Sequence, residues 1–226
     1  MRERARSTED KTLRSAALLD AAEALALELG GVRHLTVAAV TERAGLHRTG
    51  ARRYYASKED LLLELAERGW AQWRAALVAE VDGRSGLRAT EVAEIVSRTI
   101  TRLPVFCDLL AHVPMRLEGD VDIERARRFK TNSFAEHDAM VGALAEASDL
   151  SVPQVQALIA AAGALAAGFW QVAHPMPTLA ELYRQVPEWG HVALDFEPRL
   201  TMLLRATALG LTDAVPPRDS GDKIAG

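Results

Sequence analysis

The sequence predicts an all-α protein, and three observations support this prediction. Apolar residues make up 49% of the chain but aromatic residues only 5%, so the core must be rich in Ala and Leu, which favours helices over a β-sandwich or barrel. Apolar residues recur at helical spacing along most of the chain. Residues that commonly cap helices precede these segments, and glycine or proline follows many of them.

Four helical segments are expected near the N-terminus, at residues 7–29, 36–44, 47–55 and 57–82. Ser7 with Asp10, and Ser57 with Asp60, have the spacing of a capping box, in which two side chains bind free N–H groups at the start of a helix. Gly45 separates the two short segments by a tight turn. The fourth segment is long enough to connect the two ends of the molecule.

Five further helices are expected at residues 90–102, 122–147, 151–173, 178–185 and 196–211. Pro104 should end or kink the first of them and leave room for a short helix after it. Ser151 and Thr178 are the expected N-terminal caps of the third and fourth. The chain of 226 residues therefore divides into domains at 1–60 and 61–226, with residues 213–226 forming a mobile tail.

Charge and cysteine content restrict the class of protein. The net charge is −4, yet residues 1–60 hold 11 Lys and Arg against 9 Asp and Glu, whereas residues 61–226 hold 16 against 22. The basic end is thus the N-terminal end. A single cysteine, Cys107, excludes an internal disulfide. The charged N-terminus lacks a signal-peptide pattern, and the longest apolar stretch, Ala157–Trp170, is shorter than the ~20 residues that span a bilayer. We expect a cytoplasmic protein with no membrane partner.

Residues 35–62 carry the strongest functional signal, because two short helices joined by a glycine turn end in a cluster of cations. At helical spacing Ala51 and Tyr55 share an inward face, whereas Arg48 with Arg52 project outward. An α-helix fits the DNA major groove, where Arg can donate twice to guanine. The predicted DNA-binding residues are Thr36, His47, Arg48, Thr49, Arg52, Arg53, Tyr54 and Lys58.

Other interpretations of these residues remain open. An Arg-rich helical face can be an ordinary solvated surface. His47 can form a helix-start hydrogen bond in place of a DNA contact, and Tyr54 can either bind phosphate or cover the hydrophobic interior. Lys58 and the free N–H groups behind Ser57 together favour a phosphate.

This N-terminal organisation resembles the TetR family of bacterial transcriptional regulators over roughly residues 14–62. The matching residues are Ala21, Ala22, Gly30, Thr36, Ala39, Val40, Ala44, Gly45, Tyr55, Ser57, Lys58 and Leu61. Tyr55 stands where the family usually has Phe. Arg52 replaces a common phosphate-binding Tyr, Thr49 a frequent Gly, and Ala51 a bulkier apolar residue, so the operator sequence cannot be taken over from a relative.

The resemblance implies an N-terminal three-helix helix-turn-helix domain that binds a palindromic operator in double-stranded DNA, and a C-terminal helical domain that binds a ligand and forms a homodimer. It implies a repressor released by a small-molecule effector. The small residues in Ala157–Trp170 and the helix at residues 196–211 fit subunit contact, with ordinary core packing as the alternative. Candidate effector-pocket residues are Phe106, His112, Met115, Phe134, His137, Met140, Trp170 and His174, each of which can equally be plain packing.

We find no sequence pattern of an enzyme: neither a phosphate-binding glycine loop nor a nucleophile or zinc motif is present. We therefore expect no catalytic residue, no cofactor and no metal. The alternatives within this fold are an activator or an effector-independent regulator. The alternative from another class is a helical ligand-binding protein without DNA specificity.

Overall fold

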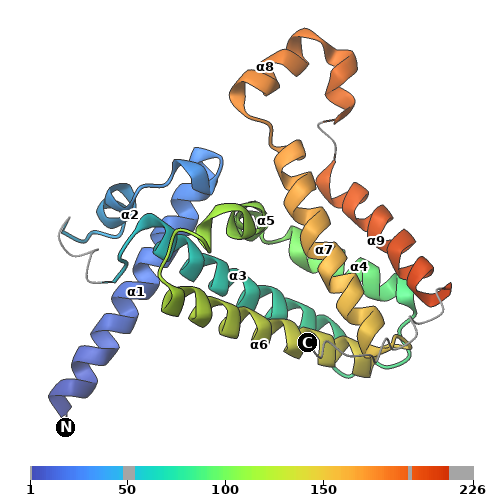
Figure 1. Cartoon of the computed structure of the whole chain (residues 1–226), viewed down its shortest axis with the longest axis horizontal. Coiled ribbons are helices and arrows are strands. Elements are labelled where there is room, and N and C mark those ends of the chain that lie inside the picture. Colours follow the sequence, from blue (N-terminus) through green and yellow to red (C-terminus); the bar gives the residue numbers. More distant parts are fainter. Residues whose placement is uncertain (1, 48–53, 193–194, 214–226) are drawn as a thin grey trace, which may run out of the picture.

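The computed structural model describes residues 2–47, 54–192 and 195–213. Within these ranges every extended regular element is a helix (Figure 1), and the β-type pairing is limited to an isolated bridge between Leu87 and Ser148. The all-α fold class is confirmed. The elements are α1 (Arg2–Leu29), η1 (Val32–His34), α2 (Val37–Arg43), α3 (Lys58–Val81), α4 (Ala89–Thr101), α5 (Pro104–His112), η3 (Val113–Leu117), α6 (Ile123–Ala147), α7 (Val152–Ala173), α8 (Pro177–Gln185), η4 (Pro187–Val192) and α9 (Phe196–Asp213).

Most helix starts lie where local sequence predicts them. The Thr36 hydroxyl accepts from the Ala39 N–H at 3.1 Å, and the Ser57 hydroxyl accepts from the Asp60 N–H, also at 3.1 Å. At the start of α7, the Ser151 N–H and hydroxyl both donate to Gln154 Oε1 at 2.9 Å. In each case a side chain satisfies a backbone donor that the helix itself leaves unpaired.

Two expected caps are wrong. Helix α1 begins at Arg2, so Ser7 lies inside it; the preceding residues Arg2–Arg6 are mostly strong helix formers and allow the helix to continue upstream. Helix α8 begins at Pro177 with Met176 as its N-cap, so Thr178 is already helical. Proline has a backbone angle preset for the first helical position, which places the start there. Most of the short segment expected at 47–55 lies outside the described residues.

Helix α5 continues directly into η3, a single π-helical turn. Pro114 lies in this turn. Proline has no N–H for the next α-helical hydrogen bond and its ring crowds the carbonyl four residues earlier, so a wider turn relieves the conflict. Sequence periodicity did not predict this element.

Two hydrophobic cores lie at the two ends of α3. The first combines α1, η1 and α2 with residues 61–66 of α3 and with side chains from α5, η3 and Phe129. The second combines the rest of α3 with α4, α6, α7 and α9, with Trp73 and Leu77 fully buried. We call the part of the chain up to Ala66 the head and the part after it the body. In Figure 1 the head lies at one end, and α7 and α9 lie side by side at the other.

Glycine at position 69 allows α3 to pack closely against α5. A Cβ at this position would lie only 2.3 Å from Cδ2 of Phe106. The Phe106 ring therefore rests directly on the α3 backbone and also contacts Trp70 edge-on, with 5.3 Å between ring centroids. This packing fixes the position of Phe106, a residue of the cavity wall.

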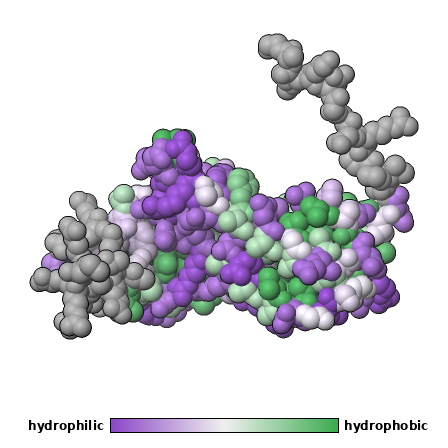
Figure 2. All heavy atoms as spheres, turned by 90° about the horizontal axis from the view of Figure 1, so that it is seen from below, coloured by the Kyte–Doolittle hydropathy of each residue, from purple (hydrophilic) through white to green (hydrophobic). Residues whose placement is uncertain are grey.

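Helix α7 is the one helix in the described ranges that is long and apolar enough to cross a membrane by length and composition. Core helices of soluble proteins pass the same test, so this is weak evidence for a membrane span. Only 28% of its most apolar window is buried within the single chain. Much of its apolar surface is thus uncovered. Figure 2 shows hydrophobic side chains gathered toward the end of the molecule away from α1 and α2.

Candidate DNA-binding head and ligand cavity

Two of the predicted DNA-binding residues, Thr36 and His47, lie on the head surface. Thr36 is exposed at the N-terminus of α2, where the helix dipole and unpaired N–H groups favour an anion. His47 is also exposed, after the turn at Gly45. Gly45 has φ of 67°, a left-handed conformation that favours glycine and ends α2 sharply. Arg48, Thr49, Arg52 and Arg53 lie outside the described residues.

Tyr54 and Tyr55 both pack against the hydrophobic core of the head. Tyr55 is 4% exposed, and its hydroxyl lies 3.0 Å from the Ser15 hydroxyl on α1. Burial raises the pKa of Tyr55 to about 12, with the Ser15 hydrogen bond acting in the opposite direction, so the phenol is neutral. Tyr54 is half-buried and packs against the same core. The expectation that Tyr55 points inward is confirmed.

Lys58 has a structural partner. Its Nζ donates to the Arg33 carbonyl at 2.8 Å, which connects the first residue of α3 to η1. Burial lowers the pKa of Lys58, and the nearby Arg116 lowers it further, whereas Glu59 acts in the opposite direction. The ammonium is only partly buried, so it can serve both the carbonyl and an external anion.

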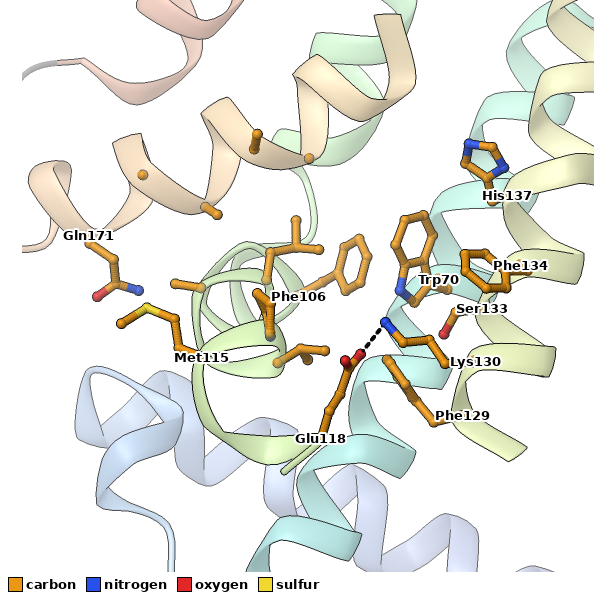
Figure 3. Close-up of a pocket in the computed structure, with 18 residues that line it drawn as sticks. Trp70, Phe106, Met115, Glu118, Phe129, Lys130, Ser133, Phe134, His137 and Gln171 are labelled. Carbon is orange, nitrogen blue, oxygen red and sulfur yellow. Dashed lines mark ion pairs between the residues drawn. The ribbon is translucent and has the colours of Figure 1, made fainter. Parts of the chain in front are cut away.

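The body contains a cavity of about 590 Å³ between α3, α5, η3, α6 and α7 (Figure 3). Its wall is mainly apolar and holds the aromatic residues Trp70, Phe106, Phe129 and Phe134. Helix α7 contributes four small residues, Gly163, Ala164, Ala167 and Gly168, followed by Gln171. Pockets of this size and composition commonly bind drug-sized apolar molecules.

Four of the eight predicted pocket residues line this cavity: Phe106, Met115, Phe134 and His137. Met140 is fully buried in the body core. The other three, His112, Trp170 and His174, lie close to Asp108. The Trp170 and His174 rings stack at 3.7 Å and share with Asp108 a smaller hollow of about 170 Å³. His112 Nε2 lies 3.6 Å from Asp108 Oδ1.

Charges in the cavity wall are paired. Lys130 Nζ lies 2.7 Å from Glu118 Oε1, the dashed contact in Figure 3. The Ser133 hydroxyl is buried without a hydrogen-bond partner. A neutral, largely apolar ligand fits this wall best, because a charged one would have to break the Lys130–Glu118 pair or leave its own charge uncompensated.

Several wall residues were missed by sequence reasoning. Trp70 lies in the helix expected at 57–82 and Gln171 in the helix expected at 151–173, and neither was among the candidate pocket residues. Asp108, which lines the smaller hollow and not this wall, also carried a usable signal, because it is a carboxylate within an otherwise apolar segment, residues 103–111. A buried carboxylate needs several donors, so such a position indicates a hydrogen-bonded site.

No group of three or more His, Cys, Asp or Glu side chains that could hold a metal ion occurs among the residues described. Cys107 is buried, and burial together with the neighbouring Asp108 raises the pKa of its thiol to about 12. The thiol is therefore a poor nucleophile.

The fold defines a helical body that contains an apolar cavity and is attached to a small helical head. Residues 67–214 match the family model described as "Tetracyclin repressor-like, C-terminal domain". This match covers well over half of the chain, and the chain therefore belongs to the TetR family of regulators, whose members are soluble and generally non-enzymatic. A comparison with curated proteins gives no match.

Proposed function

We propose that this protein is a cytoplasmic, homodimeric repressor that binds a palindromic operator through its head and is released when a small-molecule effector enters the 590 Å³ cavity. The observation that carries the proposal is the position of the cavity, whose wall includes α5, η3 and α6, the elements that also contribute to the head core. A ligand that moves these helices therefore acts directly on the support of the head.

The predicted DNA surface combines the described residues Thr36, His47, Tyr54 and Lys58 with Arg48, Thr49, Arg52 and Arg53. The arginines are assigned to base edges, and Thr36 and Lys58 to phosphates. The N-terminus of α2 and the partly exposed Lys58 ammonium support the phosphate assignment.

Dimerisation is supported by the uncovered faces of α7 and α9. Ala157 and Ala160 are exposed about one turn apart on α7, and neither lines the cavity. On α9, Leu200, Leu204 and Ala208 are buried in the body, whereas Met202 and Leu209 are more than half exposed. Small residues on one helix and large apolar residues on the other allow two copies to pack closely.

A dimer of this kind presents two heads, which must enter major grooves about 34–36 Å apart, one turn of the duplex. A small tilt of each head relative to its body changes this separation. Effector binding would thereby weaken DNA binding without any chemical change in the ligand.

The test is selection of bound duplexes from a random library by the purified full-length protein, followed by affinity measurement on the selected sequence. We expect a palindromic sequence to be enriched. The double variant Arg48→Ala, Arg52→Ala should lose about 1–3 kcal/mol of specific binding for each good bidentate contact. Arg184→Ala, on α8, is the control and should bind like the wild type. Failure to enrich any sequence would contradict the proposal and favour a ligand-binding protein without DNA specificity.

A further inference from the structure

Asp108 is a buried carboxylate at the meeting point of the cavity wall and the head. Its Oδ2 accepts from the Val32 N–H at 2.7 Å, and its Oδ1 accepts from Gln171 Nε2 at 2.7 Å. Burial raises the pKa of this carboxyl, but hydrogen bonds from His112, Val32 and Gln171 outweigh the effect and hold the pKa below its usual value. Asp108 is therefore a charged group held by His112 of its own helix and by two donors from outside α5, Val32 and Gln171.

On the head side, the partner of Asp108 is a backbone N–H group, that of Val32. Val32 is 1% exposed and begins η1, which only Leu35 separates from Thr36, the N-cap of α2. Gly31 has φ of 140°, and a Cβ at this position would lie 3.1 Å from Asp108 Oδ2. Glycine is required both for the conformation and for the close approach of the carboxylate. The Asp108 carboxylate therefore contacts the segment that leads into α2 directly.

On the cavity side, the contact is made by Gln171. It is the one polar side chain that α7 contributes to the described wall, where the other α7 residues are Gly or Ala. Figure 3 shows Gln171 at one end of the cavity near Met115, away from His137 on α6. The same amide thus lines the ligand space and donates to Asp108.

We propose that Gln171, Asp108 and Val32 form a chain of hydrogen bonds through which occupancy of the cavity changes the position of the head. The inference rests on the proposed function, since it describes how a ligand in the same cavity would affect the head. An effector with an oxygen acceptor near Gln171 competes for its amide and removes one donor from Asp108. In a site of low dielectric the carboxylate must then rearrange, and its bond to Val32 changes with it. The effector is accordingly a largely apolar molecule with a hydrogen-bonding oxygen at this end.

The coupling can be tested in the full chain without knowing the effector or the operator, by measuring hydrogen–deuterium exchange of the Val32 amide. Gln171→Leu keeps the side-chain size but removes the donor. Gly168→Leu imitates a ligand: a Cβ at this position meets no heavy atom within 4 Å, and a side chain there lies beside Gln171 at helical i, i+3 spacing. Both variants should accelerate Val32 exchange by about tenfold or more, as expected for a weakened charge-assisted bond.

Two matched controls lie outside the cavity wall. Gln156→Leu changes an exposed glutamine on α7, and Gly142→Leu adds the same side chain as Gly168→Leu at an exposed glycine of α6, where a Cβ would meet no heavy atom within 4 Å. Both should leave Val32 exchange unchanged. The Val40 amide, which donates to the Thr36 carbonyl within the head, reports any general loss of stability. Wild-type Val32 exchange in Gln171→Leu, or an equal acceleration at Val40, overturns the inference.

A second measurement separates this inference from the proposed function. On the selected duplex, Gln171→Leu and Gly168→Leu should change affinity several-fold, whereas the two controls should not. If the wild type binds no duplex, the proposed function fails, and the exchange rates still decide whether the cavity and Val32 are coupled.

Discussion

Nε of Arg125, in the first turn of α6, lies 2.5 Å from Oδ1 of Asp60, in the first turn of α3. The other oxygen of Asp60 accepts from the Ala56 N–H at 3.0 Å, just before the N-cap of α3. Arg125 is only 5% exposed and also contacts Glu67 at 2.6 Å. Helix α6 forms one wall of the cavity, so this ion pair is a second link from the cavity to the head.

Replacing Arg125 by Met should be strongly destabilising. The change removes the cation but leaves neighbouring carboxylates at Asp60, Glu64 and Glu67 close together and partly desolvated. Loss of one partner from a buried ion pair typically costs about 3–5 kcal/mol. Chemical denaturation at neutral pH measures the loss. Arg127→Met, two residues along α6, removes an exposed pair with Glu124 and should cost less than about 1 kcal/mol; equal losses in the two variants would contradict the prediction.

Glu64→Gln should raise stability at neutral pH. Burial raises the pKa of the Glu64 carboxyl, the charge of Glu67 raises it further, and Arg125 only partly compensates. A raised folded-state pKa means that the fold disfavours the ionised form, so the wild type loses stability as pH rises through that pKa. Glutamine cannot ionise. Its advantage should be a fraction of a kcal/mol at pH 7, given the partial exposure of Glu64, and should shrink towards pH 4.

The urea midpoint of Glu64→Gln and wild type, compared between pH 4 and pH 8, measures this difference. Glu124→Gln on α6 is an exposed control whose midpoint should follow the wild type. A stability difference for Glu64→Gln that is independent of pH would show that ionisation of Glu64 is not its cause.

Gly69→Ala and Gly142→Ala should change stability in opposite directions. A Cβ at Gly69 meets Phe106 at 2.3 Å, so the ring must move, at a cost of about 1–3 kcal/mol. A Cβ at Gly142 meets no heavy atom within 4 Å, and alanine there should stabilise α6 by roughly 0.5–1 kcal/mol. Thermal unfolding measures both. Since Phe106 lines the cavity, Gly69→Ala should also change the affinity for any ligand that binds there.

Lys58→Ala distinguishes a DNA contact from a purely structural role. If Lys58 binds a phosphate, the variant should weaken binding to every duplex and reduce the slope of log K against log salt by about one. Loss of its bond to the Arg33 carbonyl alone would lower the unfolding free energy and leave the salt slope unchanged. Fluorescence anisotropy across a salt series, together with denaturation, separates these outcomes. Lys130→Ala, in the body, controls for the loss of one positive charge.

Charged substitutions on the exposed faces of α7 and α9 should produce monomers. Ala160→Arg and Met202→Glu place charges on surfaces that are uncovered in the single chain but buried in the proposed dimer. Sedimentation equilibrium should show at least a tenfold weaker dimer for each variant. Ile123→Glu changes an apolar residue at the start of α6 that is even more exposed than Met202, and this variant should remain dimeric. Dimers of wild-type affinity in the first two variants would exclude these faces as the interface.

The all-α fold and most helix ends could be predicted from the sequence, because the signals that set them are local. Thr36, Ser57 and Ser151 cap helices through hydrogen bonds to residues three positions away. The same local rules were wrong at Ser7 and Thr178, where good helix formers or a proline upstream moved the start. The π-helical turn at Pro114 was missed for a related reason, since spacing does not reveal how a conflict in backbone bonding is resolved.

The composition of the site depended on contacts between distant segments. Composition and helical spacing indicated a helical body with candidate pocket residues, but only the packing of α3, α5, α6 and α7 put Phe106 and His137 into one wall and Met140 into the core. Asp108 meets Val32 and Gln171 across 76 and 63 positions of sequence. The chain alone thus determined which segments are helical and which end is basic. Tertiary structure decided which side chains line one cavity and which carboxylates bind residues of the head. Contacts between residues far apart in the chain produce no periodic pattern in the sequence, so helical spacing could not predict them.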